Sequence, residues 1–337
     1  MTGNESFPSS RDLVDSFGRT ISYVRMSVTD RCDFRCRYCM SEKMQFLPRK
    51  DLMTLKEIVD LADVFIARGV TRIRLTGGEP LVRRDVVKLI GWLGERLGRG
   101  LEELTLTTNG SHLAQYATQI ADAGVRRVNV SLDTRDPVKF RHLTRRGELA
   151  PVLAGIEAAK RAGLAIKINM VALSGINDDE ISDMLRWCDR EENDLTLIET
   201  MPLGAIDDDR SDHFLPLDEV RRRLVEEFAL VPSLARTGGP ARYYEAAGLS
   251  TRVGFITPLT NNFCDGCNRI RVTATGTVFG CLGHDQSVEL RDALRRGGVP
   301  EVSALLDRLL AGKPRRHDFR IEHASPAVDR HMSVTGG

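Results

Sequence analysis

Three cysteines lie close together near the start of the chain, at Cys32, Cys36 and Cys39. Thiolates in the spacing C-x-x-x-C-x-x-C can bind three irons of a cubane iron–sulfur cluster, which usually takes four cysteines. The iron without a cysteine can then bind a small molecule. If that molecule is S-adenosylmethionine (SAM), an electron from the cluster can break its sulfonium C–S bond and release a carbon radical. The alternative is a zinc site, but structural zinc requires four ligands.

A second triplet lies near the other end of the chain, at Cys264, Cys267 and Cys281. It also lacks an obvious fourth ligand, so the simplest interpretation is a second cluster with its own open iron. Such an iron could hold a substrate or pass electrons. Shared zinc sites built from both triplets would demand a specific geometry across the chain. The seventh cysteine, Cys188, is expected to be a buried apolar side chain.

Two arginines, Arg269 and Arg271, follow Cys267 closely. In an extended segment, residues two apart share one face, so both guanidiniums would project together beside the second triplet. Planar guanidinium groups suit the oxygens of phosphates or carboxylates. An isolated Arg-x-Arg is usually a surface feature, but next to an open iron it predicts an anion-binding site.

The composition excludes some classes of protein. Lys and Arg number 48 against 47 Asp and Glu, which predicts neither a nucleic-acid nor a membrane partner. Basic clusters at 145–146, 221–223 and 313–317 are expected to be solvated faces. The first residues are polar and no apolar run reaches the ~18–20 residues of a membrane span, so we expect no signal peptide. Cysteines that bind clusters indicate a reducing compartment, and we expect the cytoplasm.

The elements that must position these residues alternate between strand and helix. The expected strands are 23–28, 72–75, 104–107, 127–131, 165–171 and 195–199. Six βα units in series predict a parallel sheet, either a partial barrel or an open doubly wound sheet. Helix signals lie between them: a Thr54–Glu57 capping box, a start at Asn177, and three glycines at helix ends. These glycines are Gly69, Gly124 and Gly163.

Functional residues of both architectures gather at the carboxyl ends of parallel strands. The chain places polar or glycine-rich segments there repeatedly. They are the first cysteine loop, 76–80, 107–110, 131–133, Lys167 and 201–202. We therefore expect one site at this rim of the sheet.

The motifs resemble those of a known family. The first triplet, with Tyr38 before its third cysteine, resembles the signature of the radical SAM superfamily. The run 263–273 followed by Cys281 resembles the C-terminal cluster motif of the GTP 3′,8-cyclase family, molybdenum cofactor biosynthesis protein A. The resemblance extends from about residue 18 to the C-terminus. It also includes 76–80, 107–110, 131–133, 198–202, 239–241 and 336–337.

The resemblance implies an α/β fold: a partial (β/α)6 barrel of the radical SAM type, with a C-terminal α+β domain that carries a second Fe–S cluster. It divides the chain into a tail at 1–17, the barrel at 18–238 and the auxiliary-cluster domain at 239–337. The terminal Gly336-Gly337 would enter the active site. A frayed tail is the alternative for these two residues.

The resemblance also assigns site residues. Two [4Fe–4S] clusters would be bound by the two cysteine triplets. The SAM contacts would be Tyr38, Gly77, Gly78, Glu79, Ser131 and Met201. The GTP contacts would be Arg25, Arg74, Thr107, Lys167, Arg269, Ile270 and Arg271, with Arg25, Arg269 and Arg271 as catalytic residues. Thr196 departs from the family, which often has arginine there, so the triphosphate would be bound differently at this position.

The implied reaction is radical cyclisation of GTP to (8S)-3′,8-cyclo-7,8-dihydroguanosine 5′-triphosphate, a lyase reaction that begins molybdenum cofactor biosynthesis. The implied partners are a reduced flavodoxin- or ferredoxin-like electron donor and, downstream, cyclic pyranopterin monophosphate synthase; a homodimer is compatible with the resemblance. One alternative is a two-cluster radical SAM enzyme that acts on another substrate such as a peptide. Another is a non-catalytic electron carrier or zinc-binding scaffold.

Overall fold

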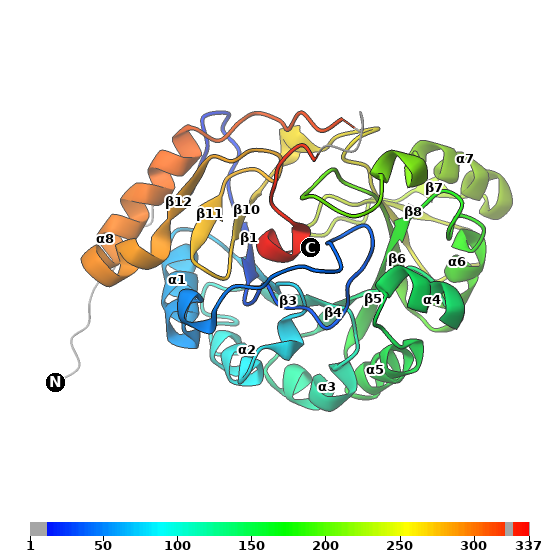
Figure 1. Ribbon diagram of the computed structural model, residues 1–337, viewed down its shortest axis with the longest axis horizontal. Coiled ribbons are helices and arrows are strands. Elements are labelled where there is room, and N and C mark those ends of the chain that lie inside the picture. The colour runs from blue at the N-terminus through cyan, green and yellow to red at the C-terminus, as the bar shows by residue number, and fades with distance from the viewer. Residues whose placement is uncertain (1–11, 321–325, 337) are drawn as a thin grey trace.

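The computed structural model describes residues 12–320 and 326–336 (Figure 1). Six parallel strands form the centre of the sheet, in the order in which they occur along the chain. They are β1 (Tyr23–Ser27), β2 (Arg72–Thr76), β3 (Glu103–Thr108), β4 (Arg127–Ser131), β5 (Ala165–Ala172) and β6 (Asp194–Glu199). Each agrees with its sequence-based expectation to within one residue at either end. The expected βα alternation is therefore confirmed.

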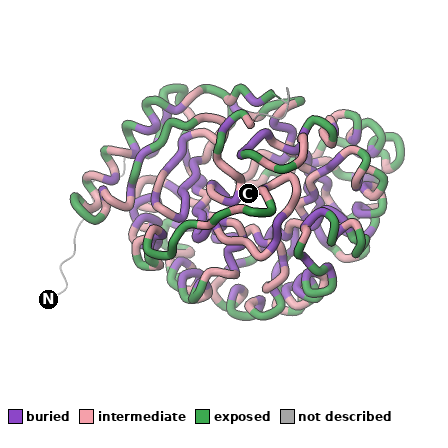
Figure 2. Tube along the Cα trace, viewed as in Figure 1, coloured by how far each residue is buried: buried purple, intermediate pink, exposed green. Residues whose placement is uncertain are grey.

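Helices follow the strands along the outer side of the curved sheet (Figure 1). They are α1 (Leu55–Ala67), α2 (Val86–Gly94), α3 (Leu113–Asp122), α4 (Pro137–Thr144), α5 (Leu149–Arg161), α6 (Ile181–Arg190) and α7 (Leu217–Phe228). Short 3-10 turns occur at Arg49–Asp51, Pro80–Val82, Arg210–His213 and Cys264–Gly266. Buried residues run along the strands and the inner sides of the helices, while the outer sides are exposed (Figure 2).

Alternation of side chains along the strands explains why the two faces of the sheet differ. Residues such as Val24, Ile73 and Leu106 point to the helices and join the main hydrophobic core. Their neighbours Arg25 and Arg74 point to the other face and line a cavity. The apolar face holds the helices in place, and the polar face is left for ligands.

The sheet does not close between β1 and β6, because later strands pair with both edges. The strand β10 (Arg269–Val272) pairs with β1 in parallel, and β9 (Val253–Ile256) pairs with β6 in parallel. Beyond them lie β11 (Thr277–Phe279) and β12 (Ser287–Glu289) on one side, and β8 (Arg242–Glu245) and β7 (Val231–Pro232) on the other. The expected partial barrel is confirmed, and segments on both sides of the proposed 238/239 boundary share one sheet.

Two helices complete the C-terminal segment. The helix α8 (Leu290–Ala311) packs against α1, and the short α9 (Met332–Thr335) lies against β1. In Figure 1 the described C-terminal end therefore lies in the middle of the barrel. No helix in the described part of the chain is both long and apolar enough to cross a membrane.

Some local expectations are confirmed and one is wrong. The Thr54–Glu57 capping box is present, and Gly69, Gly124 and Gly163 have positive φ just after their helices. Asn177, however, does not begin a helix, because α6 begins at Ile181. Its side chain instead bonds three backbone groups of nearby loops, which stabilises the polypeptide after β4 and β5.

Residues 12–17 pack on the barrel, although the sequence placed them in the tail. Leu13 is fully buried, and its backbone bonds to Arg68 and Ile21. Residues 1–11 lie outside the described part of the chain.

Candidate active site

Two adjoining cavities occupy the polar side of the barrel. Each is lined by one cysteine triplet: Cys32, Cys36 and Cys39 in the first cavity, and Cys264, Cys267 and Cys281 in the second. Four residues line both cavities and mark where they meet. These residues are Asn169, Ile198, Met201 and Met332.

The loop with the first triplet is fixed to the loop that follows β2. The Gly78 N–H donates to the Thr29 carbonyl at 2.9 Å, and the Glu79 N–H donates to the Arg31 carbonyl at 2.8 Å. A Cβ on Gly78 would overlap the Arg31 carbonyl oxygen, so this close approach requires glycine. The N–H groups of Gly78 and Glu79 thus hold the cysteine loop in place, and Gly77 and Gly78 line the first cavity.

The carboxyl of Glu79 connects the loops after β2 and β3. It is fully buried and accepts hydrogen bonds from the Leu81 N–H, the Thr108 hydroxyl and the Asn109 N–H at 2.6–2.9 Å. Burial raises its pKa to about 7, against the lowering effect of these bonds. Glu79 does not line the first cavity, so its side chain stabilises the loops that form the cavity wall.

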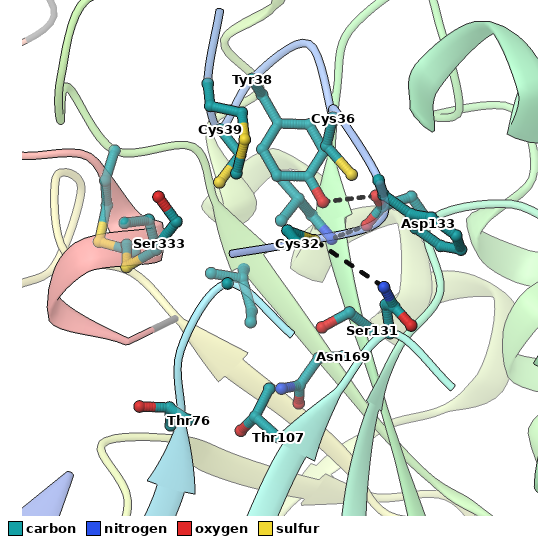
Figure 3. A pocket seen from close by; sticks show the side chains of 18 of the residues that line it. Cys32, Cys36, Tyr38, Cys39, Thr76, Thr107, Ser131, Asp133, Asn169 and Ser333 are labelled. Carbon is teal, nitrogen blue, oxygen red and sulfur yellow. Dashed lines mark hydrogen bonds between the residues drawn. The ribbon is translucent and has the colours of Figure 1, made fainter. Parts of the chain in front are cut away.

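Tyr38 forms one side of the first cavity, with its hydroxyl directed at Asp133 (Figure 3). The hydroxyl donates to Asp133 Oδ2 at 2.7 Å, and Asp133 Oδ1 accepts from the Val171 N–H at 2.9 Å. Burial raises the pKa of Asp133 to about 6. The sequence places the segment 131–133 at the rim of the sheet without giving Asp133 a role, and the position of Asp133 just after β4 is the one signal for it.

The cysteines of the first triplet are half-buried where they line the first cavity. Burial raises the pKa of Cys32 and Cys36 well above the ordinary value and that of Cys39 to about 11. A metal that binds a thiol removes its proton outright, so iron would overcome this cost. Among residues 12–320 and 326–336, no three His, Cys, Asp or Glu side chains converge on a site for one metal ion. The six cysteines of the two triplets are free thiols.

Cys188 behaves as expected from the sequence. It is fully buried within the hydrophobic core of α6 and lines neither cavity.

Cations crowd the second cavity because of the strand register. Arg25 on β1 lies beside Arg74 on β2 and beside Arg271 on β10. The pKa of Arg25 lies well below its ordinary value, mainly because the residue is buried and secondly because Arg271 repels its charge. Among the described residues, Nε of Arg74 and Nε of Arg269 are buried without a hydrogen-bond partner. Such an array is favourable only around a polyanion.

Lys167 joins this array from β5. It is 4% exposed, and its ammonium donates to the Tyr243 hydroxyl. Burial, assisted by Arg127, lowers its pKa to about 7. An anion in the cavity would raise this pKa and restore the charge.

The expected GTP contacts fall into two groups. Six line the second cavity: Arg25, Arg74, Lys167, Arg269, Ile270 and Arg271. Thr107 lines the first cavity instead, with Ser131. Thr196 lines the second cavity, and its buried hydroxyl has no hydrogen-bond partner in the described part of the chain.

In two of the basic clusters that the sequence predicted to be solvated faces, one residue is not solvated, although Arg146, Arg315 and Arg316 are exposed. Lys313 is 3% exposed, and its Nζ donates to Cys267 Sγ at 3.5 Å and to the Gly280 carbonyl at 2.6 Å. The side chain of Arg145 is 10% exposed and pairs with Asp207 at 2.9 Å. Neither position can be predicted from the sequence, because both depend on contacts with distant segments.

The described C-terminal end is ordered, so the frayed alternative is wrong for it. Ser333 and Thr335 are 2% and 1% exposed. The Gly336 carbonyl accepts a hydrogen bond from Arg271, and a Cβ at this position would overlap the Thr76 hydroxyl. Gly337 lies outside the described residues.

Comparison with known proteins places both triplets in recognised families. The family model "Radical SAM superfamily" matches residues 26–188, and "Molybdenum Cofactor Synthesis C" matches residues 193–319. A protein named GTP 3′,8-cyclase from Erythrobacter litoralis is 60% identical, over 97% of this chain and 99% of its own length. One of the same name from Rhizobium meliloti is 57% identical, over 96% of this chain and 94% of its own length.

Solved structures share the fold at low sequence identity. Streptococcus suis SuiB bound to S-adenosylmethionine has a TM-score of 0.61 and 13% identity, over 87% of this chain and 68% of SuiB. The enzyme anSMEcpe with bound AdoMet has a TM-score of 0.56 and 14% identity, over 84% of this chain and 82% of its own. At such identities the likeness concerns the fold alone.

Proposed function

Because this chain belongs to the GTP 3′,8-cyclase family of the radical SAM superfamily, we propose that it cyclises GTP in the first step of molybdenum cofactor biosynthesis. The observation that carries the proposal is the cationic array of Arg25, Arg74, Lys167, Arg269 and Arg271 beside the second triplet. It suits a triphosphate, and the cavity that holds it adjoins the one with the first triplet. No comparable observation favours a peptide substrate.

We propose that Cys32, Cys36 and Cys39 hold a SAM-cleaving [4Fe–4S] cluster. When bound, the cluster and SAM supply the radical that takes hydrogen from ribose C3′, so that C3′ can attack guanine C8. Tyr38 would lie against the adenine. The N–H groups of Gly78 and Glu79 are engaged with the cysteine loop, so the carbonyls of Gly77 and Gly78 would accept from the SAM ammonium.

In this proposal Cys264, Cys267 and Cys281 would hold a second cluster, which would supply an open iron to bind the guanine base. Arg25, Arg269 and Arg271 act on the substrate directly, and Ser131 completes the SAM pocket. The shared lining residues Met201 and Asn169 lie where the ribose must approach the radical source. The protein contributes mainly by orienting the two reactants and excluding water.

The remaining parts of the proposal concern the cellular setting. We place the enzyme, a lyase, in the cytoplasm with a reduced flavodoxin- or ferredoxin-like electron donor. Cyclic pyranopterin monophosphate synthase would consume its product, and the chain could assemble as a homodimer. Size-exclusion chromatography with light scattering tests the last point directly.

Anaerobic reconstitution tests the function itself. The protein is loaded with iron and sulfide, its iron is counted, and SAM cleavage is measured with and without GTP. We expect two clusters per chain and formation of the cyclised nucleotide only when GTP and SAM are both present. SAM cleavage without any GTP-derived product would contradict the cyclase assignment.

The triphosphate site gives a first prediction. Three single substitutions should each remove one charge-assisted contact with the triphosphate: Arg269→Ala, Arg271→Ala and Lys167→Ala. Each should make the free energy of GTP binding less favourable by about 1.5–3 kcal/mol. Calorimetry should therefore show GTP binding weakened at least tenfold, with SAM binding nearly unchanged. Arg222→Ala, on the exposed side of α7, is the control that should change neither. Unchanged GTP affinity in all three variants would rule out this site.

The C-terminal end gives a second prediction. Deletion of Gly336 and Gly337 should leave both clusters and SAM binding intact but suppress cyclisation, because Arg271 loses its contact with the Gly336 carbonyl. Product formation and uncoupled SAM cleavage are measured together. Full cyclase activity in the shortened chain would show that the tail does not position the substrate.

A further inference from the structure

We infer that Lys313 is a positioning residue for the second cluster. Its ammonium fixes the position of Cys267 and of the turn before Cys281, and its positive charge balances the negative charge of the cysteine sulfurs that bind the cluster. This inference rests on the proposed function, because it requires a cluster at the second triplet. The contact of its ammonium with Cys267 Sγ carries the inference.

The position of Lys313 is set by the end of α8. The helix ends at Ala311, and the Lys313 N–H donates to the Leu310 carbonyl at 3.2 Å. From there the side chain crosses Gly280, whose Cα would bring a Cβ to 3.5 Å from the Lys313 stem. The ammonium thus reaches two ligand-bearing segments at once, through Cys267 Sγ and the Gly280 carbonyl.

Burying the ammonium of Lys313 at this position is energetically unfavourable unless an anion lies beside it. Lys313 is 3% exposed, and an isolated buried ammonium is strongly unfavourable. Its two partners in the described part of the chain are a carbonyl and a cysteine sulfur. A neutral thiol does not balance the charge, whereas a metal-bound thiolate does. The buried lysine is therefore explained by a negatively charged cluster at this place.

The same contact has a consequence for the redox properties of the site. The reduction potential of an Fe–S cluster depends on its net charge, on hydrogen bonds to its sulfurs and on solvent exposure. A cation that donates to a ligand sulfur stabilises the more negative, reduced state. Lys313 therefore raises the potential of the second cluster, and its removal lowers it.

The test isolates the second cluster in the full-length chain. Replacing Cys32, Cys36 and Cys39 with alanine removes the first cluster and leaves a parent with about four irons. Lys313→Met, Lys313→Arg and Arg316→Met are each made in this parent. Iron content, the EPR spectrum and the midpoint potential from a reductive titration are measured.

Arg316→Met is the matched control, because it removes an exposed charge three residues away in the same segment. We expect a more negative potential and a shifted EPR spectrum for Lys313→Met, near-parental values for Lys313→Arg, and no change for Arg316→Met. Parental potential, spectrum and iron content in Lys313→Met would overturn the inference. So would a shift of equal size in Arg316→Met, which would indicate a general surface-charge effect.

Failure to bind iron is also informative. If Lys313→Met stays empty and Lys313→Arg loads, a cation at Cys267 is needed to build the site, which supports the inference. If both stay empty, the charge is not the property that matters, and the inference is wrong. A parent without iron would overturn the second cluster of the proposed function itself, which the lysine variants alone would not do.

Discussion

Replacing Cys36 with alanine is expected to abolish SAM cleavage, and with it all formation of the cyclised product. The two remaining thiolates cannot hold a cubane cluster that already lacks a fourth cysteine. Cys36 also lies at the buried wall of the first cavity, where no other described cysteine lines the space apart from Cys32 and Cys39. The measurements are iron content after anaerobic reconstitution and release of 5′-deoxyadenosine from SAM.

Cys188→Ala is the matched control for this variant. Cys188 lies on α6, is fully buried in the hydrophobic core and lines neither cavity. It should therefore keep both clusters and normal cleavage. Cleavage at the normal rate in Cys36→Ala would show that the first triplet does not bind the SAM-cleaving cluster.

Replacing Cys267 with alanine is expected to abolish cyclisation while some SAM cleavage survives. The second triplet lines its own cavity, so the loops that hold the first triplet keep their contacts. The iron content should fall to about half that of the unaltered chain. On the proposed function, the guanine base would then lose the iron that binds it, and SAM cleavage would no longer be coupled to the substrate.

The comparison of the two cysteine variants separates the roles of the clusters. Mass spectrometry of the nucleotide products and quantification of 5′-deoxyadenosine are made on the same reactions. Normal cyclisation of GTP by Cys267→Ala would contradict the assignment of two clusters. Loss of all SAM cleavage in this variant would instead indicate that the two sites depend on one another for folding.

The sequence alone located the two cysteine triplets, the six central strands and the helices between them. Cysteine spacing is a local property, and the segment before β2 already contains the capping box that begins α1. Short β-rich runs that alternate with helical stretches predicted all six central strands nearly to the residue. These features depend on neighbours in the chain, so they can be read without knowing the fold.

The family resemblance named the cations of the second cavity, but only the tertiary structure shows how they are brought together and which other residues support them. Arg25 meets Arg271 because β10 pairs with β1, two strands separated by most of the chain. The sequence predicted that Lys313 lies on the surface, but in the structure it is buried beside Cys267, at the second triplet. Thr107 was placed in the first cavity by the direction of β3. Such roles follow from long-range strand pairing and burial, which the spacing of residues along the chain does not specify.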